Sequence, residues 1–338
     1  MLQVQTSRAN RKSIWTAILA IVFVSTFTLF TNSHIAAAEP LQQSIDQNAS
    51  AGLEISPALV ELNGQKGKTY TIKVRVHNVT KGTLTYVATT NDFTAKDETG
   101  TPKIVLDTKM PETASVTGWV WPIAPFTLKP QEIKQIDVTV TIPNNAEPGG
   151  HYGLVSFAGK DPQLAGTGIR VNVSTALVLL IKVDGAVKED LTVTTMTTEQ
   201  NGKKQSFFEK GPVTILTRLQ NKGNVHVKPS GNIEVRNMFG GLVATLPLNE
   251  KSSNVLPNSI RRFESTLNQE WMIGRYEANL TAGYGTTGQA ILGTTSFWVI
   301  PYKIVLVILA VLVTIGFIIS RLIKRHNRRV IERYKKSK

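Results

Sequence analysis

Residues 70–76 read Tyr-Thr-Ile-Lys-Val-Arg-Val, and polar and apolar side chains alternate along the stretch. Residues 136–142, Ile-Asp-Val-Thr-Val-Thr-Ile, alternate in the same way. A period of two places the apolar side chains on one face of a strand, as in a half-buried antiparallel sheet. Short stretches of this kind, bounded by Gly, Pro and Asn, continue through residues 53–300 without a helical period. The sequence therefore predicts an all-β fold of immunoglobulin-like β-sandwiches.

A weak internal repeat divides this region into two copies. Each copy has a strand ending in Asn, then a Leu-Pro stretch, then Gly-x-Tyr entering another strand. The matching positions are Asn78, 128–130 and 150–152 in the first copy, and Asn221, 256–257 and 274–276 in the second. A Tyr at the start of a late strand can bond back to the chain in immunoglobulin-like sandwiches. We expect two tandem domains, 53–185 and 186–300, with an insertion in the first.

The positive charge lies mainly at the two ends of the chain. Lys and Arg number 38 against 24 Asp and Glu, a formal net charge of +14. Residues 321–338 hold nine basic residues and one acidic residue, and they follow the uncharged run 304–320. A nucleic-acid partner would require the excess on the folded face, so no nucleic-acid binding is predicted. Basic residues that flank apolar runs indicate a membrane protein.

The two apolar runs predict how the chain meets the membrane. Arg8, Arg11 and Lys12 precede the first run, and small residues follow it up to Ala38, as in a signal peptide (1–38) that is cleaved there. An uncleaved anchor is the alternative. Residues 39–52 read as a flexible mature N-terminus.

The second run predicts a transmembrane helix over 301–320, an extracellular body and a basic cytoplasmic tail over 321–338. Trp298 and Tyr302 are placed to lie at the outer membrane interface, and Arg321, Lys324 and Arg325 at the inner one.

The sequence offers no pattern for catalysis. Cys is absent, which excludes thiolate chemistry and Cys-bound metals. Nucleophile elbows, zinc-protease motifs and phosphate-binding loops are also missing. Residues 283–288 fit the dinucleotide pattern G-x-G-x-x-G, but they lie between two apparent strands and are expected to form a hairpin turn. We predict no catalytic residue, no metal and no cofactor, and thus a protein that is not an enzyme.

An aromatic stretch in the inserted region is the best candidate for a binding site. Trp119 and Trp121 lie two residues apart, with Phe126 shortly after them. On a strand, residues i and i+2 share one face. If this face is exposed, the three side chains form a platform for sugar rings or a partner protein; if it points inward, they belong to the core.

Short motifs along the chain suggest a family. They are Ile55-Ser56-Pro57 before the strand 70–76, Ala88-Thr89-Thr90-Asn91, and Pro148-Gly149-Gly150. In these motifs and in its layout the chain resembles the bacterial WxL-interacting cell-surface proteins. The resemblance implies a peptidoglycan-binding first sandwich, a second sandwich that binds surface proteins, and one C-terminal span.

These observations predict a non-catalytic, membrane-anchored bacterial cell-surface protein that attaches to cell-wall polymer, to surface proteins, or to both. The alternative is a structural accessory subunit of a membrane-embedded secretion or envelope complex.

Overall fold

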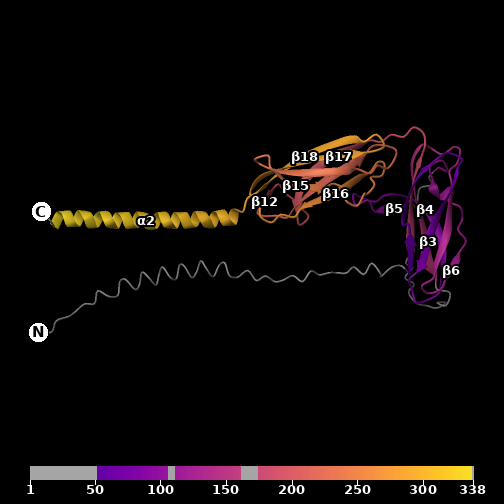
Figure 1. Ribbon diagram of the computed structural model, residues 1–338, viewed down its shortest axis with the longest axis horizontal. Helices are drawn as coiled ribbons and strands as arrows, with labels where there is room; N and C mark the ends of the chain where they lie inside the picture. The colour runs from indigo at the N-terminus through magenta and orange to yellow at the C-terminus, as the bar shows by residue number, and fades with distance from the viewer. Residues whose placement is uncertain (1–51, 106–110, 161–173, 337–338) are drawn as a thin grey trace. The chain divides into compact units, whose positions relative to one another are not determined.

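The computed structural model describes residues 52–105, 111–160 and 174–336 (Figure 1). These residues form two immunoglobulin-like β-sandwiches and one long helix, α2 (Tyr302–Lys336). The predicted fold class is therefore confirmed. The predicted signal peptide, 1–38, lies outside the described residues, as does all but the last residue of the predicted mature N-terminus, 39–52. The division between the domains at residue 185 stays a prediction.

The first sandwich packs a three-stranded sheet, in the order β1-β3-β7, on a six-stranded sheet in the order β2-β9-β8-β4-β5, with β6 also paired to β4. The two alternating stretches of the sequence form β3 (Thr69–Asn78) and β7 (Ile133–Thr141). The other elements are β1 (Leu53–Ser56), β2 (Leu59–Gly64), β4 (Leu84–Ala95), β5 (Pro102–Ile104), the 3-10 helix η1 (Val116–Gly118), β6 (Phe126–Leu128), β8 (Gly149–Lys160) and β9 (Ser174–Val183).

The second sandwich packs a sheet in the order β11-β10-β13-β16 on one in the order β12-β18-β17-β14-β15. Its strands are β10 (Leu191–Gln200), β11 (Lys203–Lys204), β12 (Phe207–Phe208), β13 (Val213–Asn221), β14 (Ser230–Asn237), β15 (Leu242–Pro247), β16 (Ile260–Leu267), β17 (Gly274–Tyr284) and β18 (Gln289–Val299). β17 and β18 are joined by a tight turn at 285–288, so the hairpin expected at the glycine-rich stretch is confirmed.

The sheets of the two sandwiches have the same pairing scheme. Each has one parallel pair among its described strands, β2 with β9 and β12 with β18. In each, a strand ending in a buried Asn, β3 or β13, lies beside a strand that begins just after the Leu-Pro stretch, β7 or β16. The internal repeat of the sequence thus corresponds to a repeat of the fold.

Each sandwich has its own core. Alternate residues of β3, β7 and β9 bury Val74, Val138 and Leu179 in the first, and β13, β14 and β17 bury Ile215, Ile233 and Ala278 in the second. The apolar strand β9 is buried on both faces, because Leu180 points away from the first core and packs with Phe93, Leu154 and Leu256.

A fully buried asparagine ties each sandwich together. In the first, the Asn78 side-chain amide donates to the carbonyl oxygens of Gly82 (2.8 Å) and Leu128 (3.1 Å). The backbone carbonyl of Asn78 accepts from the backbone N–H of Gln131 (2.8 Å), a residue with φ of 61°. One side chain therefore holds the turn after β3 and the approach to β7.

Asn221 does the same in the second sandwich. Its side-chain amide donates to the carbonyl oxygens of Val225 and Val255, both at 2.8 Å. Its backbone carbonyl accepts from Asn258 N–H (2.9 Å), and Asn258 again has a left-handed φ, 54°. The signal for both sites was present in the sequence, as Asn followed at a distance by Leu-Pro.

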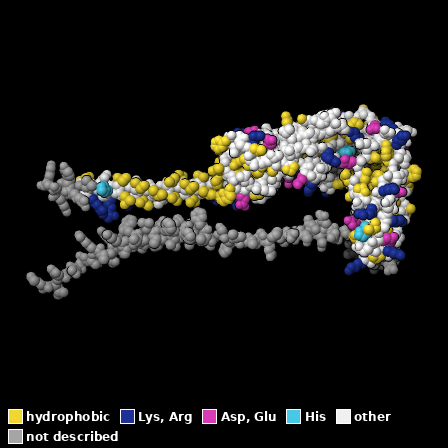
Figure 2. Space-filling model, in the orientation of Figure 1, with side chains coloured by type: hydrophobic (Ala, Val, Ile, Leu, Met, Phe, Trp, Pro, Cys, Tyr) yellow, Lys and Arg dark blue, Asp and Glu magenta, His cyan; other side chains and the backbone are white. Residues whose placement is uncertain are grey.

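Helix α2 is the part of the described chain that suits a membrane. Over Tyr302–Arg329 it is long and apolar enough to cross one. At 1.5 Å per residue, these 28 residues extend about 42 Å. In Figure 2 hydrophobic side chains cover the helix and Lys and Arg side chains gather toward its C-terminal end.

Candidate functional site

The inserted segment before β6 is fixed by a buried carboxylate. Asp92 of β4 is 8% exposed, and it accepts hydrogen bonds from Ser115 Oγ (2.6 Å), Val116 N–H (2.8 Å) and Thr117 N–H (3.2 Å). The unpaired N–H groups at the start of η1 are thereby satisfied. The segment forms a helical turn at this point, not an extended strand.

The three aromatic residues of the predicted platform do not share a surface. Trp119 is 2% exposed, donates from Nε1 to the Glu112 carbonyl (2.9 Å) and packs on the His151 ring at a centroid distance of 4.5 Å. Phe126 is buried against Tyr86 and Phe157.

Trp121 is 58% exposed. The platform was therefore wrong for Trp119 and Phe126, which belong to the core. The rule that residues i and i+2 share a face fails here because η1 ends at Gly118, and Trp119 still closes that turn by donating to the Val116 carbonyl.

Trp121 lies beside the edge strand of the smaller sheet. Its backbone N–H donates to the Thr139 carbonyl (2.9 Å), and its Nε1 donates to Thr141 Oγ1 (2.9 Å). Thr141 N–H in turn donates to the Trp119 carbonyl (2.8 Å). The inserted segment thus covers the outer edge of β7 at its C-terminal end.

The rest of that edge has no strand beside it among the described residues, because β3 is the one other neighbour of β7. In an antiparallel pair, backbone groups of alternate residues point to the same side. Thr139 and Thr141 point outward, so Ile133, Gln135 and Asp137 do as well. We call these three residues the open β7 edge. Their side chains are exposed, Ile133 by 56%.

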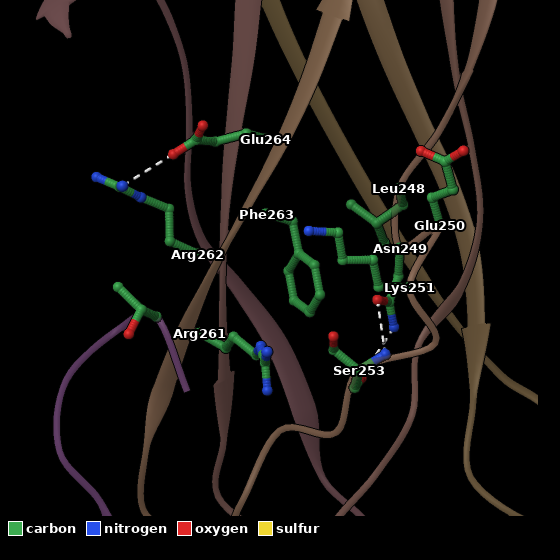
Figure 3. Close-up of a pocket in the computed structure, with 10 residues that line it drawn as sticks. Leu248, Asn249, Glu250, Lys251, Ser253, Arg261, Arg262, Phe263 and Glu264 are labelled. Carbon is green, nitrogen blue, oxygen red and sulfur yellow. Dashed lines mark hydrogen bonds and ion pairs between the residues drawn. The ribbon is translucent and has the colours of Figure 1, made fainter. Parts of the chain in front are cut away.

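A polar pocket of about 370 Å³ lies on the second sandwich, between β16 and the loop 248–253 (Figure 3). The Arg262 guanidinium pairs with Glu264 (2.8 Å), and Arg261 Nη1 donates to the Asn254 carbonyl (2.7 Å). Burial lowers the pKa of Arg261. Figure 3 shows the Phe263 ring between Arg261 and Lys251.

The pocket therefore presents charges of both signs around one apolar ring. It holds no paired nucleophile and base, and the described part of the chain has no group of three His, Asp or Glu that could bind a metal.

Residues of the two sandwiches also meet around Glu61 and His226. Burial alone would raise the pKa of Glu61, but hydrogen bonds from Asn254 (2.7 Å) and Lys228 outweigh it and lower the pKa. Burial lowers the pKa of His226 to about 4, and its Nδ1 lies 3.4 Å from the Tyr152 hydroxyl. His226 is thus a titratable group of the second sandwich that lies against Tyr152 of the first.

The predicted membrane-interface residues lie just before α2, at its first residue and within it. Trp298 lies at the end of β18 and is 38% exposed, and Tyr302 begins α2. Arg321, Lys324 and Arg325 are exposed on α2. Their role at a membrane interface stays a prediction.

Comparisons with known proteins give a likeness of fold. No protein-family model and no curated protein matches the chain. Among solved structures, the class 5 fimbrial chaperone CfaA has 16% sequence identity and a TM-score of 0.38, over 72% of this chain and 98% of its own. The E. coli chaperone DraB has 13% identity and a TM-score of 0.32, over 73% of this chain and 96% of its own.

A third structure is the CsuC–CsuE complex of a chaperone with a tip adhesion subunit, from the Csu pili of Acinetobacter baumannii. It has 11% identity and a TM-score of 0.34, over 72% of this chain and 97% of that chain. At such identities and scores the likeness carries no argument about function.

The expected resemblance to the WxL-interacting proteins was wrong, because the solved structures named above are fimbrial chaperones and no family model matches. The motifs that suggested it are general features of the fold: Ser56 ends β1, and Gly149 opens β8 at a φ of 126°. The expected attachment to cell-wall polymer depended on that resemblance and is withdrawn with it.

Proposed function

We propose that this protein is an accessory subunit of a membrane-embedded envelope or secretion complex, and that it binds a partner protein without catalysing a reaction. The observation that carries this proposal is the open β7 edge with the exposed Trp121 beside it. An unpaired strand edge is a template for a strand of another chain, and natural proteins usually cover it.

Strand addition would use the backbone of the open β7 edge. The outward N–H and C=O groups of Ile133, Gln135 and Asp137 would bond to a partner strand, which gives affinity with little dependence on sequence. Trp121 and Ile133 offer apolar surface at either end of this edge, and large aromatic side chains contribute strongly at protein interfaces.

Helix α2 would hold this surface at the membrane. The basic residues after the apolar run favour a cytoplasmic C-terminus, and the sandwiches would then lie on the opposite side. Anchoring both proteins in one membrane raises the effective concentration of the binding surface for its partner. A modest strand contact would then suffice.

Proline substitution tests the strand contact. The Gln135 N–H points away from β3, so Gln135→Pro removes a donor from the free edge and leaves the β3–β7 ladder intact. Gln135→Ala is the matched control, because it keeps that donor. The full-length protein is purified from membranes of its own host, and the proteins that accompany it are quantified.

We expect one defined membrane or envelope protein to accompany the parent chain and the Gln135→Ala variant, and to be lost with Gln135→Pro. Circular dichroism establishes that both variants are folded. Equal recovery with Pro and Ala would exclude the strand contact, and recovery of no partner with any of the three chains would exclude the accessory role.

A further inference from the structure

Large apolar side chains are exposed at one end of the second sandwich. Phe239 is 87% exposed, Trp271 73%, Ile273 68% and Phe207 67%. Met238 and Ile300 are exposed beside them. We call these six residues the apolar rim. Exposed apolar surface gathered in this way marks an interaction site far more often than single exposed residues do.

Strand pairing places the rim residues together, although they come from four parts of the sequence. Phe207 is the register partner of Trp298 in the parallel pair β12–β18. Gly274, directly after Ile273, is the partner of Val299, directly before Ile300. A side chain at Gly274 would lie 2.7 Å from Met238 Cε. Figure 2 shows hydrophobic side chains at the end of this sandwich where the chain continues into α2.

The six rim residues are uncharged, and charged residues border them: Glu270 precedes Trp271, and Arg275 follows Gly274 and is the register partner of Trp298. The segments that supply most of the rim read Asn-Met-Phe-Gly-Gly-Leu over 237–242, Trp-Met-Ile-Gly over 271–274 and Ser-Phe-Trp-Val-Ile-Pro-Tyr over 296–302. Two of the bordering cations face acidic residues, Lys303 with Glu209 (2.8 Å) and Arg275 with Glu277 (3.9 Å). A soluble surface would interrupt so many apolar residues with charges.

Chain connectivity holds the rim near the start of the helix. β18 ends at Val299 and α2 begins at Tyr302, so two residues join them. A chain extends at most about 3.6 Å per residue, so this end of the sandwich lies within about 11 Å of the first residue of α2. If α2 spans the membrane, as the proposed function requires, the rim cannot leave the membrane surface.

We propose that the apolar rim inserts into the interfacial layer of the lipid bilayer and holds the second sandwich against the membrane. Trp and other amphipathic aromatic side chains favour this layer, and apolar residues on a surface bind the boundary between headgroups and acyl chains. The anchor of this protein is then a helix together with a lipid-binding face of its folded domain.

The absence of Cys from the sequence allows a direct test with the full chain. Single cysteines are introduced as Phe239→Cys and Trp271→Cys in the rim. Leu292→Cys is the control, because Leu292 is 70% exposed in β18 but lies about 23 Å along the strand from Val299. Each variant carries the fluorophore NBD and is reconstituted into phosphatidylcholine vesicles with or without doxyl-labelled phosphatidylcholine.

We expect the doxyl lipid to quench the fluorophore at 239 and 271 several-fold more than at 292, with emission shifted to the blue at the first two positions. Equal, weak quenching at all three positions would overturn the proposal. Flotation after an alkaline wash separates this from failure of the anchor. If the protein floats but the rim positions are not quenched, the proposed lipid-binding face alone is excluded. If the protein does not float, the membrane anchor is excluded as well.

Discussion

The two sandwiches share their strand pairing and their buried asparagine, but they differ in what lies between β4 and β7 in the first and between β14 and β16 in the second. The second has the hairpin β14–β15, which joins the sheet directly. The first has β5, η1 and the inserted segment, which leaves the sheet and returns across the edge of β7. The same strand arrangement can therefore occur twice, while the insertion in one copy determines which part of the β7 edge is exposed.

The first way to sharpen this comparison is to separate the two tryptophans of the insertion. Trp119→Ala removes a buried ring together with its hydrogen bond to Glu112, and we expect a loss of about 4 kcal/mol in the free energy of unfolding. Trp121→Ala removes an exposed ring and should cost less than about 1 kcal/mol. Urea unfolding of the full chain in detergent, followed by circular dichroism, measures both values. Similar losses at the two positions would contradict the assignment of Trp119 to the core.

The second test asks whether the two asparagines are equivalent. Asn78→Ala and Asn221→Ala each leave buried carbonyl groups without a donor, and we expect each to lower the free energy of unfolding by about 3 kcal/mol. If the sandwiches unfold separately, Asn78→Ala shifts one urea transition and Asn221→Ala the other. Lys81 and Lys222 are exposed neighbours of the two asparagines, so Lys81→Ala and Lys222→Ala serve as controls. Each should change the free energy of unfolding by less than about 0.5 kcal/mol. A small effect at one asparagine alone would break the parallel between the sandwiches.

Much of the strand arrangement of the two sandwiches could be predicted from the sequence because it depends on local patterns. The alternation over 70–76 and 136–142 predicted the strands β3 and β7. The repeat of Asn and Leu-Pro predicted the end of β3 and the start of β7, and the corresponding positions of β13 and β16. Tyr276 was expected to bond back to the chain, and its hydroxyl does donate to the Ile273 carbonyl at 3.3 Å. These features are local, or they recur in both copies.

The binding surfaces could not be predicted in the same way. Trp119 and Trp121 looked alike, and their opposite environments depend on Asp92, a residue 24 positions before η1 that satisfies its first N–H group. The open β7 edge is a consequence of strand order, which alternation does not reveal. The apolar rim gathers residues from separate turns, so no single stretch of sequence displays it.

The third test concerns the contact between the sandwiches. The folded-state pKa of His226 is about 4, below its ordinary value of 6.5, so the folded protein binds fewer protons than the unfolded chain between these values. The contribution of neutral His226 to the free energy of unfolding is therefore fully present above about pH 6.5 and is lost as the pH falls toward 4. Since His226 is partly exposed, we expect a loss of roughly 2 kcal/mol.

His226→Gln should remove this part of the pH dependence, leaving the decline caused by Glu61 at lower pH, where a carboxylate with a lowered pKa becomes protonated. Unfolding midpoints measured from pH 7 to pH 4 compare the two chains. Parallel curves for the parent and the variant would show that His226 is not buried in the contact.

The smallest expected effect compares the two tyrosines of the Gly-x-Tyr repeat. Tyr276 is 7% exposed and its hydroxyl also accepts from Ile273 N–H at 3.2 Å, so Tyr276→Phe leaves both groups of Ile273 without that partner and should cost about 1 kcal/mol. Tyr152, at the matching position, meets His226 through a longer contact of 3.4 Å, so Tyr152→Phe should cost less than about 0.5 kcal/mol.

Urea unfolding of the two variants measures the difference, with Tyr70→Phe as a third chain because the Tyr70 hydroxyl accepts from Gln65 N–H at an exposed site. If Tyr152→Phe lowers the free energy of unfolding more than Tyr276→Phe does, the hydroxyl of Tyr152 contributes more through its contact with His226 than the hydroxyl of Tyr276 does through its hydrogen bonds to Ile273. The tyrosines at the two matching positions would then have different roles. Tyr276 would stabilise its own sandwich, and Tyr152 would stabilise the contact between the two sandwiches.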